Sequence, residues 1–281
     1  MDIEQLKDKL QILEEKIIQL NESIDTNLMV AKSLQKALTP DQACNINGLT
    51  CFSKYQSSND FRVESYNIYS SKDKKSIWFY RSMTGSFGLS SVLMDVLFQN
   101  KIQKSLLNNL ITPKELVSVL INGLVEAKTK KPFRLQVSKL DLKTLTLNIL
   151  NKGFPLPMVY EGEREKFSIK FPKFDETKEM ENYLLPCENY TAESINEMHK
   201  INTQLSPGSR VLMFGNSWFE SSSLNNFILN AFPENWTPKE NLLSDINDFM
   251  LNANEHQKKS SFKGDVSVIG FEIDPKKLYI A

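Results

Sequence analysis

The chain has 281 residues, of which 41% are hydrophobic and 24% are charged, and its 34 basic residues balance its 34 acidic ones. This composition is ordinary for a soluble globular protein. A chain of zero net charge has no overall field that would attract nucleic acid or an anionic membrane, so neither partner is expected. No apolar run approaches the roughly 20 residues that a membrane-spanning helix needs.

Cysteine and histidine are sparse. The three cysteines, Cys44, Cys51 and Cys187, lack the CxxC spacing of a zinc or redox motif, and the only histidines are His199 and His256. An odd number of scattered cysteines argues against a disulfide framework, and two histidines cannot form a multi-histidine metal centre. The N-terminus is acidic and amphipathic, unlike a signal peptide. These features predict reduced thiols and a cytoplasmic protein.

Hydrophobic residues recur at alternating intervals of three and four through the first 38 residues. This spacing forms the seam of a coiled coil, and Ile or Leu at one core position with Leu at the other favours a parallel dimer. The predicted dimer seam consists of Ile3, Leu6, Leu10, Leu13, Ile17, Leu20, Ile24 and Asn27, and the pattern continues to Leu38. Pro40 ends the pattern, so residues 1–40 are predicted to be a coiled-coil, regulatory helix. The alternative is a single amphipathic helix that folds back on its own domain.

Beyond residue 40, strand patterns and helix patterns share one domain, residues 41–281. Strands are predicted near residues 49–55, 61–69, 76–83, 135–137, 145–149, 211–214 and 266–273. Helices are predicted at residues 89–107, 113–127 and 238–251, the last two opened by the capping boxes that begin at Thr112 and Thr237. The run Ile77–Tyr80 is apolar on both faces, which is typical of a central, covered strand. The order of elements favours an α+β fold, a β-sandwich flanked by helices.

Five segments carry a family resemblance. They are Ala31–Pro40 (AKSLQKALTP), Gly85 with the helix at Ser90–Met94, Asn151–Pro157 (NKGFPLP), Leu205–Phe214 (LSPGSRVLMF) and Gly264–Ser267 (GDVS). In this order they resemble the entry helix and the motifs DVSGHG, NAGHPPP, LxPGDxLLLY and DDxT of the SpoIIE branch of PPM-type, metal-dependent serine/threonine phosphatases. The resemblance implies a β-sandwich flanked by helices.

The same resemblance implies a degenerate metal site. In active members, aspartates at strand ends hold two divalent cations, which activate the water that attacks phosphorus. The corresponding positions in this chain are Glu64, Asn67, Ser82, Asn216 and Gly264. Only Glu64 keeps a negative charge there, and one carboxylate does not offset the four charges of two cations. We therefore expect no metal, no cofactor and no catalytic residue, with manganese or magnesium as the alternative.

Two functional hypotheses follow. The first is a catalytically inactive homologue, a pseudophosphatase, that acts as a dimeric signalling or protein-binding module in a partner-switching pathway. The resemblance gives it a phosphoprotein or a STAS-domain protein as partner, and Phe87 and Phe154 would plug the former metal cleft. The second is a divergent phosphatase with a rebuilt site, in which Glu64 and Asp265 are the remaining ligands. A further option is that residues 1–38 are the functional part.

Overall fold

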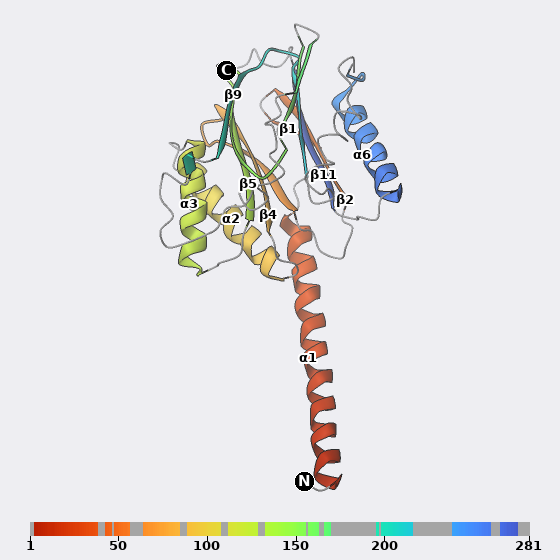
Figure 1. Cartoon of the computed structure of the whole chain (residues 1–281). Coiled ribbons are helices and arrows are strands. Elements are labelled where there is room, and N and C mark those ends of the chain that lie inside the picture. The colour runs from red at the N-terminus through yellow and green to blue at the C-terminus, as the bar shows by residue number, and fades with distance from the viewer. Residues whose placement is uncertain are drawn as a thin grey trace.

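The computed structural model describes residues 3–38, 43–46, 48–56, 64–84, 89–107, 112–128, 133–155, 157–162, 166–169, 195–196, 198–215, 238–259 and 265–274. Two antiparallel sheets lie face to face, with helices on the outer side of each (Figure 1). A long N-terminal helix projects away from this body. The predicted α+β sandwich is therefore the observed architecture.

The first sheet has six strands in the order β1-β2-β11-β10-β7-β8. Their bounds are β1 Ala43–Ile46, β2 Leu49–Gln56, β11 Val266–Ile273, β10 Arg210–Phe214, β7 Met158–Glu161 and β8 Lys166–Ile169. Every neighbouring pair is antiparallel. Strands from the two ends of the sequence, β2 and β11, are therefore neighbours in the middle of this sheet.

The second sheet has five antiparallel strands in the order β3-β4-β5-β6-β9. Their bounds are β3 Glu64–Ser70, β4 Ser76–Thr84, β5 Phe133–Asp141, β6 Thr146–Lys152 and β9 His199–Gln204. The run Ile77–Tyr80 of β4 is buried on both faces, because Ile77 and Phe79 pack between the sheets while Trp78 and Tyr80 pack toward the helices. The prediction of a covered central strand is confirmed.

Helices α2 (Leu89–Leu107) and α3 (Pro113–Glu126) cover the five-stranded sheet, and α6 (Leu242–Lys259) covers the six-stranded one (Figure 1). The predicted capping box is present at α3, where the Thr112 side chain accepts from the Glu115 backbone and the Glu115 side chain accepts from the Thr112 backbone. Each outer interface and the space between the sheets holds its own hydrophobic cluster.

Helix α6 begins later than the sequence predicts. Its expected start was the box at Thr237, which lies outside the described residues, and its first helical residue is Leu242. The Lys239 backbone N–H donates to Asp245 at 2.7 Å, and Arg210 binds the carbonyls of Lys239 and Glu240. Asn241 then accepts from the Ser244 backbone at 2.9 Å. These bonds hold residues 239–241 in a loop, so Asn241 caps the helix instead.

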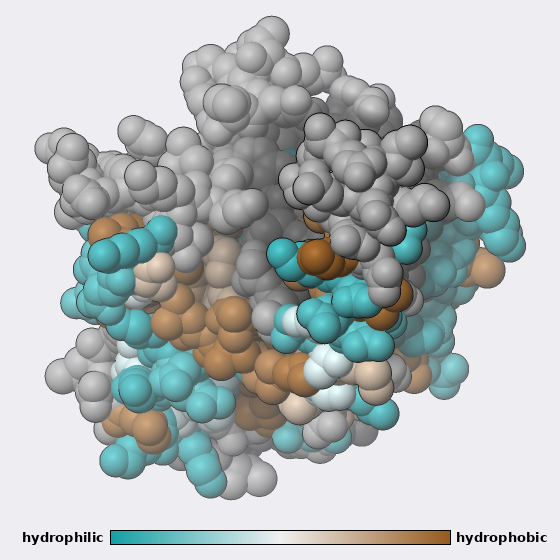
Figure 2. All heavy atoms as spheres, turned by 90° about the horizontal axis from the view of Figure 1, so that it is seen from below, coloured by the Kyte–Doolittle hydropathy of each residue, from teal (hydrophilic) through white to brown (hydrophobic). Residues whose placement is uncertain are grey.

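Helix α1 (Ile3–Leu38) is the projecting N-terminal element (Figure 1). Its C-terminal end contacts α2, where Ala31 is completely buried and Leu34 and Leu38 are half-buried. From Ile12 to Asn27 every side chain is exposed. Figure 2 shows hydrophobic side chains gathered near the centre of the face from which α1 projects. Within the described residues, no helix has both the length and the apolar character that crossing a membrane requires.

Candidate functional site

A buried ion pair lies at one end of the space between the sheets. Glu64 is the first residue of β3, and Arg81 follows Ile77 and Phe79 on the inward face of β4. Arg81 Nη2 lies 3.2 Å from Glu64 Oε2, and the side chains of both residues are only 1% exposed. A strand residue that continues an apolar inward face is buried whether or not it is charged, so the guanidinium needs a partner inside the protein.

Ser267 of β11 joins this pair from the opposite sheet. Its hydroxyl accepts from Arg81 Nη2 at 2.9 Å and donates to Glu64 Oε2 at 2.5 Å, so the three side chains close a ring of contacts. Hydrogen bonds to charged groups are stronger than neutral ones, which favours this arrangement inside a low-dielectric interior. We call Glu64, Arg81 and Ser267 the cleft cluster.

Gly215 leaves room for the cleft cluster. A Cβ atom at this position would lie 2.2 Å from Glu64 Oε2 and 2.3 Å from Ser267 Oγ, distances that no carbon can adopt. The Gly215 backbone N–H donates to the Ser267 carbonyl at 2.9 Å, which fixes the end of β10 against β11. The Glu64 carboxylate therefore occupies the space that any side chain at residue 215 would need.

An aromatic ring covers the guanidinium. Arg81 Cζ lies 4.8 Å from the ring centroid of Phe154, which is completely buried, so this cation–π contact is shielded from water. Burial lowers the pKa of Arg81, although the neighbouring Glu64 carboxylate acts in the opposite direction. Arg81 Nη1 is buried and has no hydrogen-bond partner among the described residues. Phe154 therefore covers the ion pair, whereas Phe87, the other residue of the expected apolar plug, lies outside the described residues.

Three of the five predicted ligand positions lie in the described residues, and the structure does not place these three on one face. Glu64 faces the opposite sheet, whereas Asn67 donates to Gln99 of α2 at 3.1 Å and the Ser82 hydroxyl lies 2.5 Å from the Tyr80 hydroxyl on the helix side. Successive strand residues point to opposite faces, so Glu64 and Asn67, three positions apart, cannot share one. Asn216 and Gly264 lie outside the described residues.

Asp265 is the other acid of the alternative hypothesis. It is completely buried just before β11, and it accepts a hydrogen bond from the Tyr55 hydroxyl of β2. Among the described residues, no group of three histidine, cysteine, aspartate or glutamate side chains could hold a metal ion. Asp265 and Glu64 are therefore each engaged by protein donors within the described part of the cleft.

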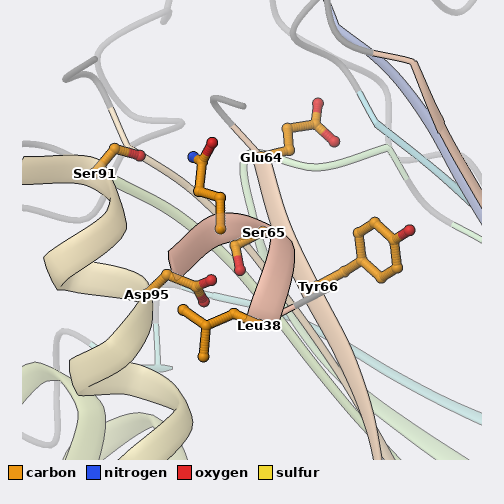
Figure 3. Close-up of a pocket in the computed structure, with 7 residues that line it drawn as sticks. Leu38, Glu64, Ser65, Tyr66, Ser91 and Asp95 are labelled. Carbon is orange, nitrogen blue, oxygen red and sulfur yellow. The ribbon is translucent and has the colours of Figure 1, made fainter. Parts of the chain in front are cut away.

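A small pocket lies beside the cleft cluster, where α1, β3 and α2 meet (Figure 3). Its volume of about 20 Å³ is room for roughly one water molecule. Its lining consists of Gln35, Leu38, Glu64, Ser65, Tyr66, Ser91 and Asp95.

Gln99 Nε2 contacts both Asp95 oxygens at 3.2 Å and the Leu38 carbonyl at 3.4 Å, so α2 binds the last turn of α1. Burial, and secondarily the Asp95 charge, raises the pKa of Tyr80.

Sequence reasoning missed Arg81. The sequence did contain a signal, because a single charge follows the apolar run Ile77–Tyr80 on a strand that is covered on both faces. A charge at such a position is buried and must find a counter-ion. Glu64 was singled out for a different reason, and only the pairing of β3 with β4 shows that the two belong together.

No family model and no curated protein matches this sequence. Several solved structures do match its fold. The PP2C domain of SiaA from Pseudomonas aeruginosa aligns with a TM-score of 0.63 at 12% identity, covering 91% of this chain and 99% of that one. The PP2C domain of SpoIIE from Bacillus subtilis, with a fragment of its regulatory domain, aligns at 0.53 and 12% identity over 96% and 97%.

A third match is the RsbU and RsbW domains of Rv1364c from Mycobacterium tuberculosis, with a TM-score of 0.56 at 11% identity. It covers 82% of this chain but only 61% of the mycobacterial one, so the present chain spans less than two thirds of that protein. At sequence identities this low, the structural likeness establishes only the fold of this chain. The activities of the matched proteins are therefore not assigned to it.

The expectation of no cofactor is wrong for this fold. RsbX, at a TM-score of 0.52 and 8% identity, was solved in complex with magnesium, and the PstP catalytic domain, at 0.50 and 9%, with 2 manganese ions. Proteins of this architecture therefore do use such metals. The described residues of this chain do not fit a pair of them, because the Arg81 guanidinium binds the Glu64 carboxylate and no group of three potential ligands lies together among those residues.

The alignments cover 91% and 96% of this chain, so its overall fold is shared with known phosphatase domains. The SpoIIE-type resemblance that the five sequence segments suggested is confirmed at the level of the fold. This chain has the architecture of the PPM-type, or PP2C, phosphatase domains.

Proposed function

We propose that this chain is a non-hydrolysing relative of PP2C-type phosphatases, a pseudophosphatase that acts by binding a partner protein. The observation that supports it is the cleft cluster, in which a protein cation, Arg81, lies against the one charged residue that the metal positions retain. A divalent cation could use Glu64 only by displacing this guanidinium. The displaced charge would stay in a buried site beside the metal, where like charges repel strongly.

The direct test is a phosphatase assay with the full chain. Phosphate release from p-nitrophenyl phosphate and from a phosphoserine peptide is measured with manganese or magnesium, and the catalytic domain of the phosphatase PstP serves as the positive control of the same fold. We expect release from this chain to equal that of the enzyme-free buffer at every metal concentration. Metal-stimulated release that scales with the concentration of this protein would refute the proposal.

The second candidate function is a divergent metal-dependent phosphatase with a rebuilt site. The magnesium-bound and manganese-bound structures of the same fold favour it, as do the two buried acids Glu64 and Asp265. It predicts that manganese stabilises the protein, by roughly 2.7 kcal/mol at a hundredfold excess over the dissociation constant. The variants Glu64→Gln and Asp265→Asn would then lose that stabilisation, while Asp248→Asn, at an exposed position of α6, would keep it.

We further propose that the chain forms a homodimer through α1, with residues 1–40 acting as a regulatory helix and residues 41–281 as the binding domain. Leu13, Ile17 and Leu20 of the predicted seam are 57%, 56% and 62% exposed, which is unusual for large apolar side chains in a monomer. Beyond Asn27 the seam turns into the domain, because Ala31 is buried against it. The pairing surface open to a second copy therefore ends before Ala31.

The partner is proposed to be a phosphoprotein or a STAS-domain protein of a partner-switching pathway. The support is the likeness to a structure that contains RsbU and RsbW domains. Binding is tested with purified phosphorylated and unphosphorylated STAS domains by titration calorimetry, with the full chain and with a chain that lacks residues 1–38. Retained binding after truncation would place the contact on the sandwich, whereas its loss in a truncated chain that circular dichroism shows to be folded would make residues 1–38 the functional part.

A further inference from the structure

Two of the cysteines lie directly opposite each other in the β1–β2 hairpin. Cys44 and Cys51 are register partners in this antiparallel pair, although they are seven positions apart in the sequence. Opposed residues of antiparallel strands have Cα atoms about 4.5–5.5 Å apart. Disulfides span Cα distances of about 4.4–6.8 Å, so the backbone already satisfies the distance that this bond requires.

The two side chains also share a face. Cys51 is completely buried in the cluster between the sheets, and Cys44 is a half-buried neighbour that packs against the same cluster. Directly opposed residues project to the same side of a sheet, so the two thiols meet there. A hydrogen bond with Cys44, together with burial, raises the pKa of Cys51. Cys44 is therefore the thiol that a reagent reaches first.

We propose that Cys44 and Cys51 form a reversible disulfide, a modification site that is oxidised by a low-molecular-weight disulfide such as glutathione disulfide. Cys44 loses its proton and its thiolate attacks one sulfur of the small disulfide, whose S–S bond breaks and releases one thiolate. Cys51 then gives its proton to a released thiolate and attacks the Cys44 sulfur, which releases the second small thiol. In sum, two protein thiols are oxidised and one small disulfide is reduced to two thiols.

The bond would fasten the strand that follows α1. Within the described residues β1 is an edge strand that pairs only with β2, and four residues separate it from the end of α1. Strand β2 pairs in turn with β11, which carries Ser267 of the cleft cluster. Oxidation therefore joins an edge strand, which can otherwise open locally, to the centre of the six-stranded sheet.

The test uses the full chain carrying Cys187→Ser, so that the third cysteine cannot take part. The protein is equilibrated in glutathione buffers of increasing oxidation, and free thiols are alkylated and mapped by mass spectrometry. We expect both thiols to disappear together, with a peptide pair linked through Cys44 and Cys51 that is lighter by two hydrogen atoms. Amide hydrogen exchange in Ala43–Ile46 should slow by roughly tenfold or more on oxidation.

Single variants test whether Cys44 reacts with glutathione disulfide before Cys51, or whether both thiols react alike. In the same background, Cys51→Ser should leave Cys44 trapped as a mixed disulfide with glutathione, and Cys44→Ser should leave Cys51 reduced. A glutathione adduct that accumulates on Cys44 without an intramolecular link, or equal modification of Cys51 in the Cys44→Ser protein, would overturn the proposal. Circular dichroism checks that each variant is folded, and Cys44→Ala replaces Cys44→Ser if the latter unfolds.

Discussion

Arg81 is the residue on which the interpretation of the cleft depends. Removing one partner of a buried ion pair leaves the other charge without compensation, at a cost of about 3–5 kcal/mol. We expect Arg81→Met and Glu64→Gln each to lower the free energy of unfolding by about that amount. The double variant should lose much less than the sum, because neither charge is then left alone.

Urea denaturation of the four proteins in this double-mutant cycle measures the coupling. The exposed pair Lys101–Glu126, with N–O 3.0 Å and side chains 29% and 70% exposed, is the matched control. Lys101→Met should cost less than about 1 kcal/mol, because water already screens that pair. Additive losses at Arg81 and Glu64 would show that the two charges do not stabilise each other.

Replacing glycine by alanine should have opposite effects on stability at Gly215 and at Gly123. Gly215→Ala would place its Cβ against Glu64 Oε2 and Ser267 Oγ, neither of which can move without breaking the cleft cluster. We expect a loss of about 1–3 kcal/mol in the free energy of unfolding. Gly123→Ala in α3 meets only the flexible end of Lys101, at 3.0 Å, and replaces a poor helix former. Thermal unfolding should show that this variant gains up to about 1 kcal/mol.

At the scale of elements, the turn between β5 and β6 makes stability depend on pH. Desolvation alone would raise the pKa of Asp141, but hydrogen bonds from Thr144 and Lys143 outweigh it and lower the pKa from its ordinary value of 3.8. A carboxyl whose folded-state pKa is depressed stabilises the fold above the unfolded-state pKa. That contribution is lost as pH falls from about 3.8 through the lower folded value.

Two variants of this turn check the sign. NMR titration of Asp141 should give a midpoint below 3.8, and Thr144→Val, which removes the hydroxyl donor at 3.0 Å, should raise that midpoint. Asp141→Asn should make the free energy of unfolding fall less steeply as the pH drops below about 3.8. A midpoint at or above 3.8 in the unmodified chain would contradict the role assigned to the turn.

The sequence predicted those helices and strands that are defined by the pattern of residues within the element itself. Helices α2 and α3 and strands β2, β4 and β11 lie where hydrophobic periodicity and one capping box placed them. Strand β9 was not assigned because its residues are mostly polar and exposed and it lies at the edge of the sheet in the described part of the chain, and β1 has only four residues. The cleft cluster could not be predicted either. Glu64, Arg81 and Ser267 come from three strands and two sheets, and no local pattern joins them.

At the scale of the whole molecule, α1 has two parts in different environments. From Ile12 to Asn27 its side chains are exposed, whereas Ala31, Leu34 and Leu38 pack toward the domain and Gln99 binds the Leu38 carbonyl. The predicted seam is thus continuous in the sequence but divided in the structure. Two truncations should therefore have different effects.

Removal of residues 1–27 should abolish dimerisation and leave the unfolding temperature of the domain unchanged. Removal of residues 1–38 should also uncover α2 and destabilise the domain, because buried Ala31 and the Leu38 carbonyl are lost with it. Sedimentation equilibrium and thermal unfolding separate the two effects. In the full chain, Leu20→Glu should dissociate the dimer while Gln19→Glu, which adds the same charge beside the seam, should not. A chain that stays monomeric at all concentrations would exclude the second copy, and α1 would then serve only its own domain.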